Sequence, residues 1–135
     1  MAYTGSIHND SYPSFILNAD ISSKYLAMYH IVATPNTVDV AIDQTKAATF
    51  AGISQETNPL KAGDAVALKS NGYSLAQAGG TVAVGAKCTV TTGWKLIATT
   101  TATDKVVAIC VAGGANGELI EVKILPAPML YSAFA

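Results

Sequence analysis

The chain has 135 residues, of which 50% are hydrophobic and only 13% are charged, and its formal net charge is −1. A chain of this length is expected to form one domain that buries roughly two-thirds of its unfolded surface. Arginine is absent and the eight lysines are scattered singly, which excludes the basic stripe that binds nucleic acid. No apolar run approaches the ~18 to 20 residues of a membrane helix, so we expect no membrane partner.

The low share of charged residues indicates that some apolar surface meets another protein surface. The N-terminus lacks the charged and then apolar pattern of a secretory signal, so we expect a soluble protein that is made in a cytoplasm. Other protein surfaces are therefore the expected partners.

Residues 1–23 show no sustained hydrophobic period, and we interpret them as an extended N-terminal arm. Their aromatic and aliphatic side chains indicate that contact with a partner orders the arm. Two alternatives remain open, a disordered terminus and an edge strand on the chain's own domain. The side chains expected to make the contact are Tyr12, Phe15, Ile16 and Leu17.

Two strands are predicted over residues 25–33 and 37–42, joined by a turn at Thr34, Pro35 and Asn36. The second strand alternates apolar residues with Asp39, which is typical of a sheet with one wet and one dry face. Residues 43–50 predict one short helical turn that Asp43 could cap. Residues 51–54 predict a further short strand.

Residues 62–75 and 84–96 repeat one short sequence pattern, which we call the duplicated phrase. Each copy reads as a glycine turn, an alternating strand, a polar glycine turn and a strand led by an aromatic residue. Gly63 aligns with Gly85 and Tyr73 with Trp94. Because alternation bounded by such turns is typical of half-buried strands, the phrase predicts a duplicated β-hairpin.

Two more strands are predicted near the C-terminus, over residues 106–111 and 118–125. The first is apolar on both faces, which predicts a central strand, and Pro126 is expected to end the second. Residues 126–135 then form a short apolar tail that we expect to be covered by its own barrel or by a neighbour. Its apolar members are Met129, Leu130, Tyr131 and Phe134.

Many short strands, closely spaced glycine turns and little helix predict an all-β fold, a small β-barrel or closed β-sandwich. The expected organisation is the arm over residues 1–23, a β-barrel domain over 24–125 and the tail over 126–135. Closure would also remove the sheet edges that such a weakly charged chain would otherwise expose.

No arrangement of residues predicts catalysis, a cofactor or a metal site. His8 lies in the arm, His30 lies within a predicted strand, and the nine acidic residues are dispersed without a carboxylate pair. We therefore expect that the protein is not an enzyme. Tyr73 and Trp94 admit two interpretations: stacking platforms for sugars or bases, or core or interface packing of a barrel rim, which we favour.

Cys88 and Cys110 are the only cysteines, and both lie in apolar, strand-like runs. Free cysteine packs as a small hydrophobe, so buried free thiols are the favoured interpretation. A disulfide between neighbouring strands is the alternative, while a metal site lacks further ligands nearby.

The run of glycine turns and valine-rich strands resembles the small capsid decoration, or cement, proteins of tailed bacteriophages. The resemblance covers about residues 25–125. It is carried by the segments Gly52–Ser54, Leu60–Leu68, Asn71–Gly72, Ala78–Val82, Val84–Gly85, Cys88–Val90 and Gly117–Leu125. These segments form a fold signature and contain no catalytic residue.

The resemblance implies a β-barrel that binds the outer surface of a capsid, commonly as a homotrimer, and locks neighbouring major capsid proteins together. The expected location is therefore the outside of a virion head. In this hypothesis the barrel is a rigid spacer, and the apolar residues of the arm and the tail make the contacts. The alternative is another virion part, such as a head-fibre base or a tail-associated adaptor, with receptor or carbohydrate binding.

Overall fold

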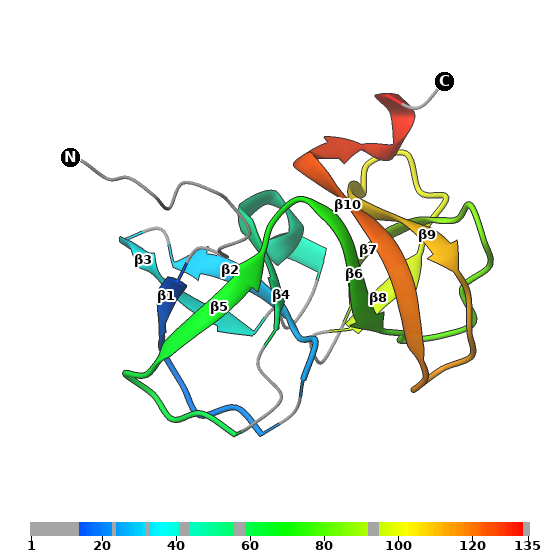
Figure 1. Cartoon of the computed structure of the whole chain (residues 1–135). Coiled ribbons are helices and arrows are strands. Elements are labelled where there is room, and N and C mark those ends of the chain that lie inside the picture. Colours follow the sequence, from blue (N-terminus) through cyan, green and yellow to red (C-terminus); the bar gives the residue numbers. More distant parts are fainter. Residues whose placement is uncertain are drawn as a thin grey trace, which may run out of the picture.

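The fold is described from a computed structural model of the chain, which describes residues 14–22, 24–31, 33–40, 44–55, 59–91 and 95–133. These residues form two five-stranded units that lie side by side (Figure 1). The first unit contains β1 (Ser14–Leu17), β2 (Ala27–Ile31), β3 (Thr34–Val40), β4 (Phe50–Ser54) and β5 (Ala65–Lys69). The second contains β6 (Gly72–Gln77), β7 (Lys87–Thr91), β8 (Lys95–Ala98), β9 (Lys105–Ala112) and β10 (Leu119–Leu130).

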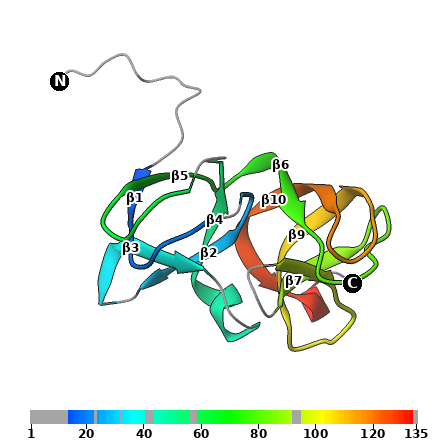
Figure 2. The ribbon, with the colours of Figure 1, turned by 90° about the horizontal axis from the view of Figure 1, so that it is seen from below.

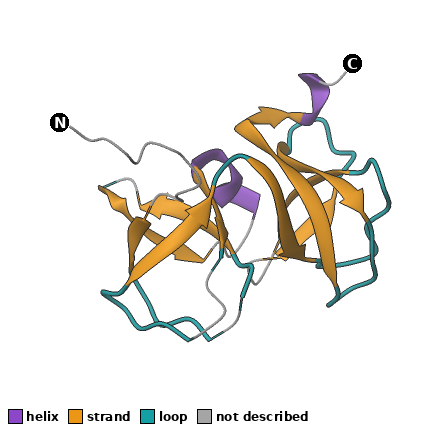
Figure 3. Cartoon of the chain, viewed as in Figure 1, coloured by secondary structure: helices purple, strands orange, loops and turns teal. Residues whose placement is uncertain are grey.

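Helical structure among the described residues is limited to two short 3-10 helices, η2 (Gln44–Thr49) and η3 (Tyr131–Ala133). Figure 3 shows that strands make up most of both units. The predicted all-β class is confirmed, as is the helical turn expected over residues 43–50, which the structure places at η2. The division of the strands into two units was not predicted.

The first unit is a closed barrel with the strand order β1-β3-β2-β4-β5. Strand β1 closes it, because β1 pairs in parallel with β3 and antiparallel with β5. The residues that follow β1 are also tied to the barrel, since Ile21 bridges Leu60 and the Asp20 carboxylate accepts a hydrogen bond from the Ala62 amide at 2.8 Å. Residues 14–22 therefore belong to the barrel, which corresponds to the alternative of a strand on the chain's own domain.

The second unit is a sheet with the order β6-β10-β9-β7-β8. Its two outer strands approach each other, because Ala78, just after β6, forms a parallel bridge with Leu96 of β8. The Gly79 amide also donates a hydrogen bond to the Leu96 carbonyl at 2.8 Å. The sheet thus curls round on itself, as the view from below shows (Figure 2).

The duplicated phrase forms a hairpin only once. In the second copy, β7 and β8 pair antiparallel from Cys88↔Ala98 to Thr91↔Lys95. In the first copy the prediction is wrong, because β5 pairs with β4 and β1 while β6 pairs with β10 in the other unit. Both edges of β5 are thereby occupied by strands of the barrel, so β6 must find its partner elsewhere.

The prediction that Pro126 ends the last strand is also wrong. Strand β10 continues to Leu130, and its last residues Met129 and Leu130 pair with Val106 and Lys105 of β9. The register shifts between Ile124 and Met129. The two prolines of β10 therefore lie at an irregularity of the ladder, where a residue without an amide hydrogen is tolerated.

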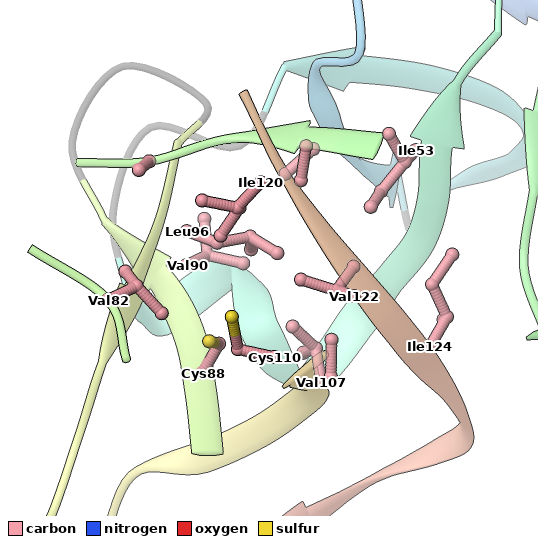
Figure 4. Packing of buried hydrophobic residues seen from close by; sticks show 14 of the residues in the cluster. Ile53, Val82, Cys88, Val90, Leu96, Val107, Cys110, Ile120, Val122 and Ile124 are labelled. Carbon is pink, nitrogen blue, oxygen red and sulfur yellow. The ribbon is translucent and has the colours of Figure 1, made fainter. Parts of the chain in front are cut away.

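Two apolar clusters fill the molecule. The smaller lies in the barrel and contains Met28, Val38 and Leu68. The larger fills the second unit and also takes in Ala27 of β2 and Ile53 of β4, so it joins the two units (Figure 4). Helix η2 lies against β7 and β9 as well as β2 and adds Ala47 to this cluster.

Candidate functional site

His30, the histidine of the predicted strand, packs against an aromatic ring. It lies partly buried on β2, and its ring meets the Phe15 ring edge-on with centroids 5.2 Å apart and an interplanar angle of 70°. This contact packs β1 against β2, so His30 contributes to closure of the barrel. His8 lies outside the described residues, as does Trp94.

Within the described ranges, no three His, Cys, Asp or Glu side chains gather in a way that would hold a metal ion. No helix of that part of the chain is long and apolar enough to cross a membrane. A shallow depression of about 260 Å³ lies between the loop after β1 and the loop before β5. Its polar lining is Asp20, Ser22 and Lys61, and the Asp20 carboxylate already accepts the Ala62 amide.

The two cysteines are buried free thiols, as favoured from the sequence. Cys88 on β7 and Cys110 on β9 both lie in the larger cluster (Figure 4). Burial, together with the nearby Cys110, raises the pKa of the Cys88 thiol from 9.0 to about 12, and burial also raises the pKa of Cys110. A thiol reacts as the thiolate, so burial lowers the reactivity of both groups in the folded protein.

The arm residues that the sequence singled out do not share one environment. Phe15 is half-buried and Ile16 is 40% exposed, whereas Leu17 is only 2% exposed and packs in the barrel core. The Leu17 side chain is therefore not free to contact a partner in this structure. Tyr12 lies outside the described residues, and an interface role for Phe15 and Ile16 stays a prediction.

The described part of the tail is held by its own unit. Met129 and Leu130 pair with β9 but remain 42% and 41% exposed. The Tyr131 amide donates a hydrogen bond to the Asp104 carbonyl at 2.8 Å, and the Lys87 ammonium lies 5.9 Å from the centre of the Tyr131 ring. Phe134 lies outside the described residues. Partner contacts by Met129, Leu130 and Tyr131 stay a prediction.

Sequence reasoning missed a partly apolar face on the second unit. Tyr73 and Leu75 of β6 are 55% and 38% exposed, Leu119 of β10 is 42% exposed and Val111 of β9 is 38% exposed. Their inward neighbours on β6, Ser74 and Ala76, are smaller. Successive residues of a strand point to opposite faces of the sheet. The alternation of large apolar residues with small ones along β6 is therefore a signal that could have identified this face.

The chain was compared with known proteins in three ways. No protein-family model matches it, and no curated protein sequence matches it. Among solved structures it is similar to the head fiber gp8.5 N base of bacteriophage phi29, with a TM-score of 0.60 and 16% sequence identity. The similarity covers 87% of this chain and 95% of that one, so the two share a fold over nearly their whole lengths.

Proposed function

We propose that this chain is a structural protein of a bacteriophage virion that sits on the outer surface of the head, as a base of the head-fibre type. The observation that carries the proposal is the shared fold, which spans 87% of this chain and 95% of the head-fibre base. At 16% identity the likeness concerns architecture, and a role based on rigid architecture needs no particular reactive residue.

The properties of the described residues support a structural role. The two units are joined by a continuous apolar cluster, and the two thiols inside it are protected from reaction by burial. Exposed apolar side chains are present on both units, for example Ile16 on the barrel and Met129 on β10. Such residues supply the contact area that attachment to a shell requires. We propose the major capsid protein as the partner and no enzymatic activity.

Capsid cementing is the second candidate function. It is favoured by the glycine-turn and valine-strand segments that resemble decoration proteins, and it requires that the chain stabilise contacts between major capsid proteins. A repeated small contact is sufficient for this, because many copies on one shell add up to an avid lattice. The two candidates differ in what removal of the chain does to the head.

Add-back to purified heads tests the proposal. Heads assembled without the chain are mixed with the purified protein, and bound copies are counted as the concentration rises. The proposal expects saturable binding to the outer surface. Binding to tails alone, or no binding to heads, would overturn it. Heads that lose only a projecting fibre when the chain is missing support a base, whereas heads that also break at a lower temperature support cementing.

Point variants show which side chains make the attachment. Ile16→Ser and Met129→Ser each remove an exposed apolar side chain from the segments predicted to contact the shell. We expect each to weaken head binding about three- to tenfold, the effect of losing one partly buried apolar contact. Val84→Ser is the matched control, because Val84 is 71% exposed and lies outside those segments. Equal effects of all three substitutions would argue against the predicted contact residues.

A further inference from the structure

The outer face of β6 and β10 presents an ordered pattern of side chains. Antiparallel pairing places Tyr73 opposite Lys123, and Leu75 opposite Glu121. All four side chains are exposed, and residues directly opposite each other share one face of a sheet. We call Tyr73, Leu75, Glu121 and Lys123, with Leu119 beside them, the outer face.

This face carries large apolar groups where a solvated strand would carry polar ones. The inward-facing side chains of β6 are Ser74 and Ala76, so its bulkier residues point outward. The Lys123 ammonium lies 5.9 Å from the centre of the Tyr73 ring, which lays the lysine stem along the aromatic surface. Exposed apolar side chains that are rimmed by polar ones are typical of a protein contact site.

The charges of the outer face complement themselves. Glu121 and Lys123 are two residues apart on one strand, so they lie roughly 6.6 Å apart on the same face. If two copies stack face to face with their β10 strands antiparallel, a two-fold axis places Glu121 of each copy opposite Lys123 of the other. The same operation places Tyr73 of each copy over Leu75 of the other. With the strands parallel, like charges would meet instead.

We propose that the outer face is a self-association surface at which two copies of this chain pack about a two-fold axis. A two-fold interface uses one patch on both subunits, so the patch must match itself in charge and shape. The formal net charge of −1 adds little repulsion between copies. A three-fold ring is built from two different patches, so the homotrimer implied by the family resemblance would have to use other surfaces.

The expected affinity is weak. The outer face offers five side chains, whereas a standard stable interface uses about 20 to 30 residues on each side. We therefore expect dissociation constants of about 0.1 to 1 mM in solution, and copies concentrated on one assembly would associate more strongly through avidity. The inference concerns the free chain and does not depend on the proposed virion role.

Charge reversal with complementation tests the inference by sedimentation of the purified full chain up to about 1 mM, the weak end of the affinity range. Glu121→Lys leaves two lysines facing two lysines, and Lys123→Glu leaves two glutamates facing two glutamates. We expect each single variant to self-associate about tenfold more weakly, because two attractive exposed pairs become repulsive. An equimolar mixture of the two variants should regain the wild-type affinity, and so should the double variant.

Lys61→Glu is the matched control for Lys123→Glu, because it makes the same change in net charge on an exposed loop of the other unit. It should leave self-association within about twofold of wild type, and unchanged circular dichroism would show that every variant is folded. The inference is overturned if the wild-type chain stays monomeric throughout, if the reversals leave association unchanged, or if mixing the two reversals fails to restore it.

Discussion

The two copies of the duplicated phrase begin alike and end in different sheets. The Gly63 and Gly85 turns have φ angles of 91° and 85°. In the first copy the Gly63 amide donates to the Leu17 carbonyl of β1, and in the second the Gly85 amide donates to the Cys110 carbonyl of β9, both at 2.8 Å. The strands that follow, β5 and β7, are then buried at equivalent positions, as Leu68 and Val90 show.

The difference arises at the second strand of each copy. Strand β8 folds back on β7, whereas β6 leaves β5 and pairs with β10. Strand β5 is already paired on both edges, with β1 and β4. Local sequence therefore determines the turn and the strand, while the edges left free by distant strands determine the pairing partner.

The largest loss of stability is expected from a substitution in β4, the strand that pairs with the second edge of β5. Gly52 of β4 has a φ of 144°, and a Cβ at this position would lie 2.6 Å from the Lys69 carbonyl oxygen of β5. Gly52→Ala therefore adds overpacking of about 1 to 3 kcal/mol and backbone strain of about 1 to 3 kcal/mol. Denaturant unfolding should show a loss of about 2 to 6 kcal/mol.

Gly80→Ala in the second unit is the control for this substitution. A Cβ at Gly80 would lie 3.4 Å from the Ile97 side chain, an ordinary contact. Its effect on the free energy of unfolding should stay within about 1 kcal/mol. If Gly52→Ala proved equally mild, the close packing of β4 on β5 would be contradicted.

Strand β1 occupies the other edge of β5, and Leu17 tests its place in the barrel. Because the Leu17 side chain is 2% exposed, Leu17→Ala should lower the free energy of unfolding by about 3 kcal/mol. Ile16→Ala, at a side chain that is 40% exposed, should cost under about 1 kcal/mol. A Leu17→Ala protein as stable as wild type would instead indicate an arm that does not close the barrel.

Alkaline pH is expected to act on the second copy through Cys88, which aligns with the non-titrating Val66 of the first copy. The folded pKa of Cys88 is about 12, above its ordinary value of 9.0. The buried neutral thiol therefore stabilises the fold fully below pH 9, and this contribution is lost between pH 9 and 12. The loss is at most about 1.4 kcal/mol per pH unit.

Unfolding measurements at successive pH values check this expectation. The slope above pH 9 should be shallower in Cys88→Ala than in wild type, whatever the absolute stability of that variant. Identical slopes in the two proteins would show that the Cys88 thiol does not titrate on unfolding.

The smallest loss of stability is expected from alanine at the glycine turn that opens each copy, and the loss should be equal in the two copies. A Cβ at Gly63 or Gly85 would meet no atom within 4 Å, so only the positive φ opposes a side chain. Gly63→Ala and Gly85→Ala should each cost about 1 to 2 kcal/mol in thermal or denaturant unfolding. A difference above about 1 kcal/mol between them would mean that the two turns are not equivalent.

Much of the fold could be predicted from short-range pattern. The strands near residues 37–40 and 119–124 follow apolar alternation, and β2 and β3 pair as the predicted neighbours. The turn predicted at Thr34, Pro35 and Asn36 is wrong, because these residues begin β3. The pairing of β6 with β10 could not be predicted, because it joins residues about 50 positions apart through edges that only the folded barrel leaves free. The sequence also did not predict that Ala51 and Ile53, on either side of Gly52, lie in different apolar clusters.

The candidate interaction surfaces were predicted only in part. Ile16, Met129 and Leu130 were singled out because they are apolar and near the ends of the chain, and each is about 40% exposed. Leu17 was singled out on the same ground, yet it is a core residue because β1 enters the barrel. The outer face was missed because Tyr73 was considered together with Trp94, and only the pairing of β6 with β10 places Glu121 and Lys123 beside Tyr73 and Leu75.

The central claim is that the first copy of the duplicated phrase crosses from one unit to the other. The shared fold, and with it the proposed function, depends on this crossing. Proton–proton contacts measured by NMR test it most directly. The account predicts cross-strand backbone contacts between Ser74 and Val122 and between Phe15 and Val66. Contacts between Leu68 and Tyr73 and between Val66 and Leu75 would show a hairpin in the first copy and would contradict it.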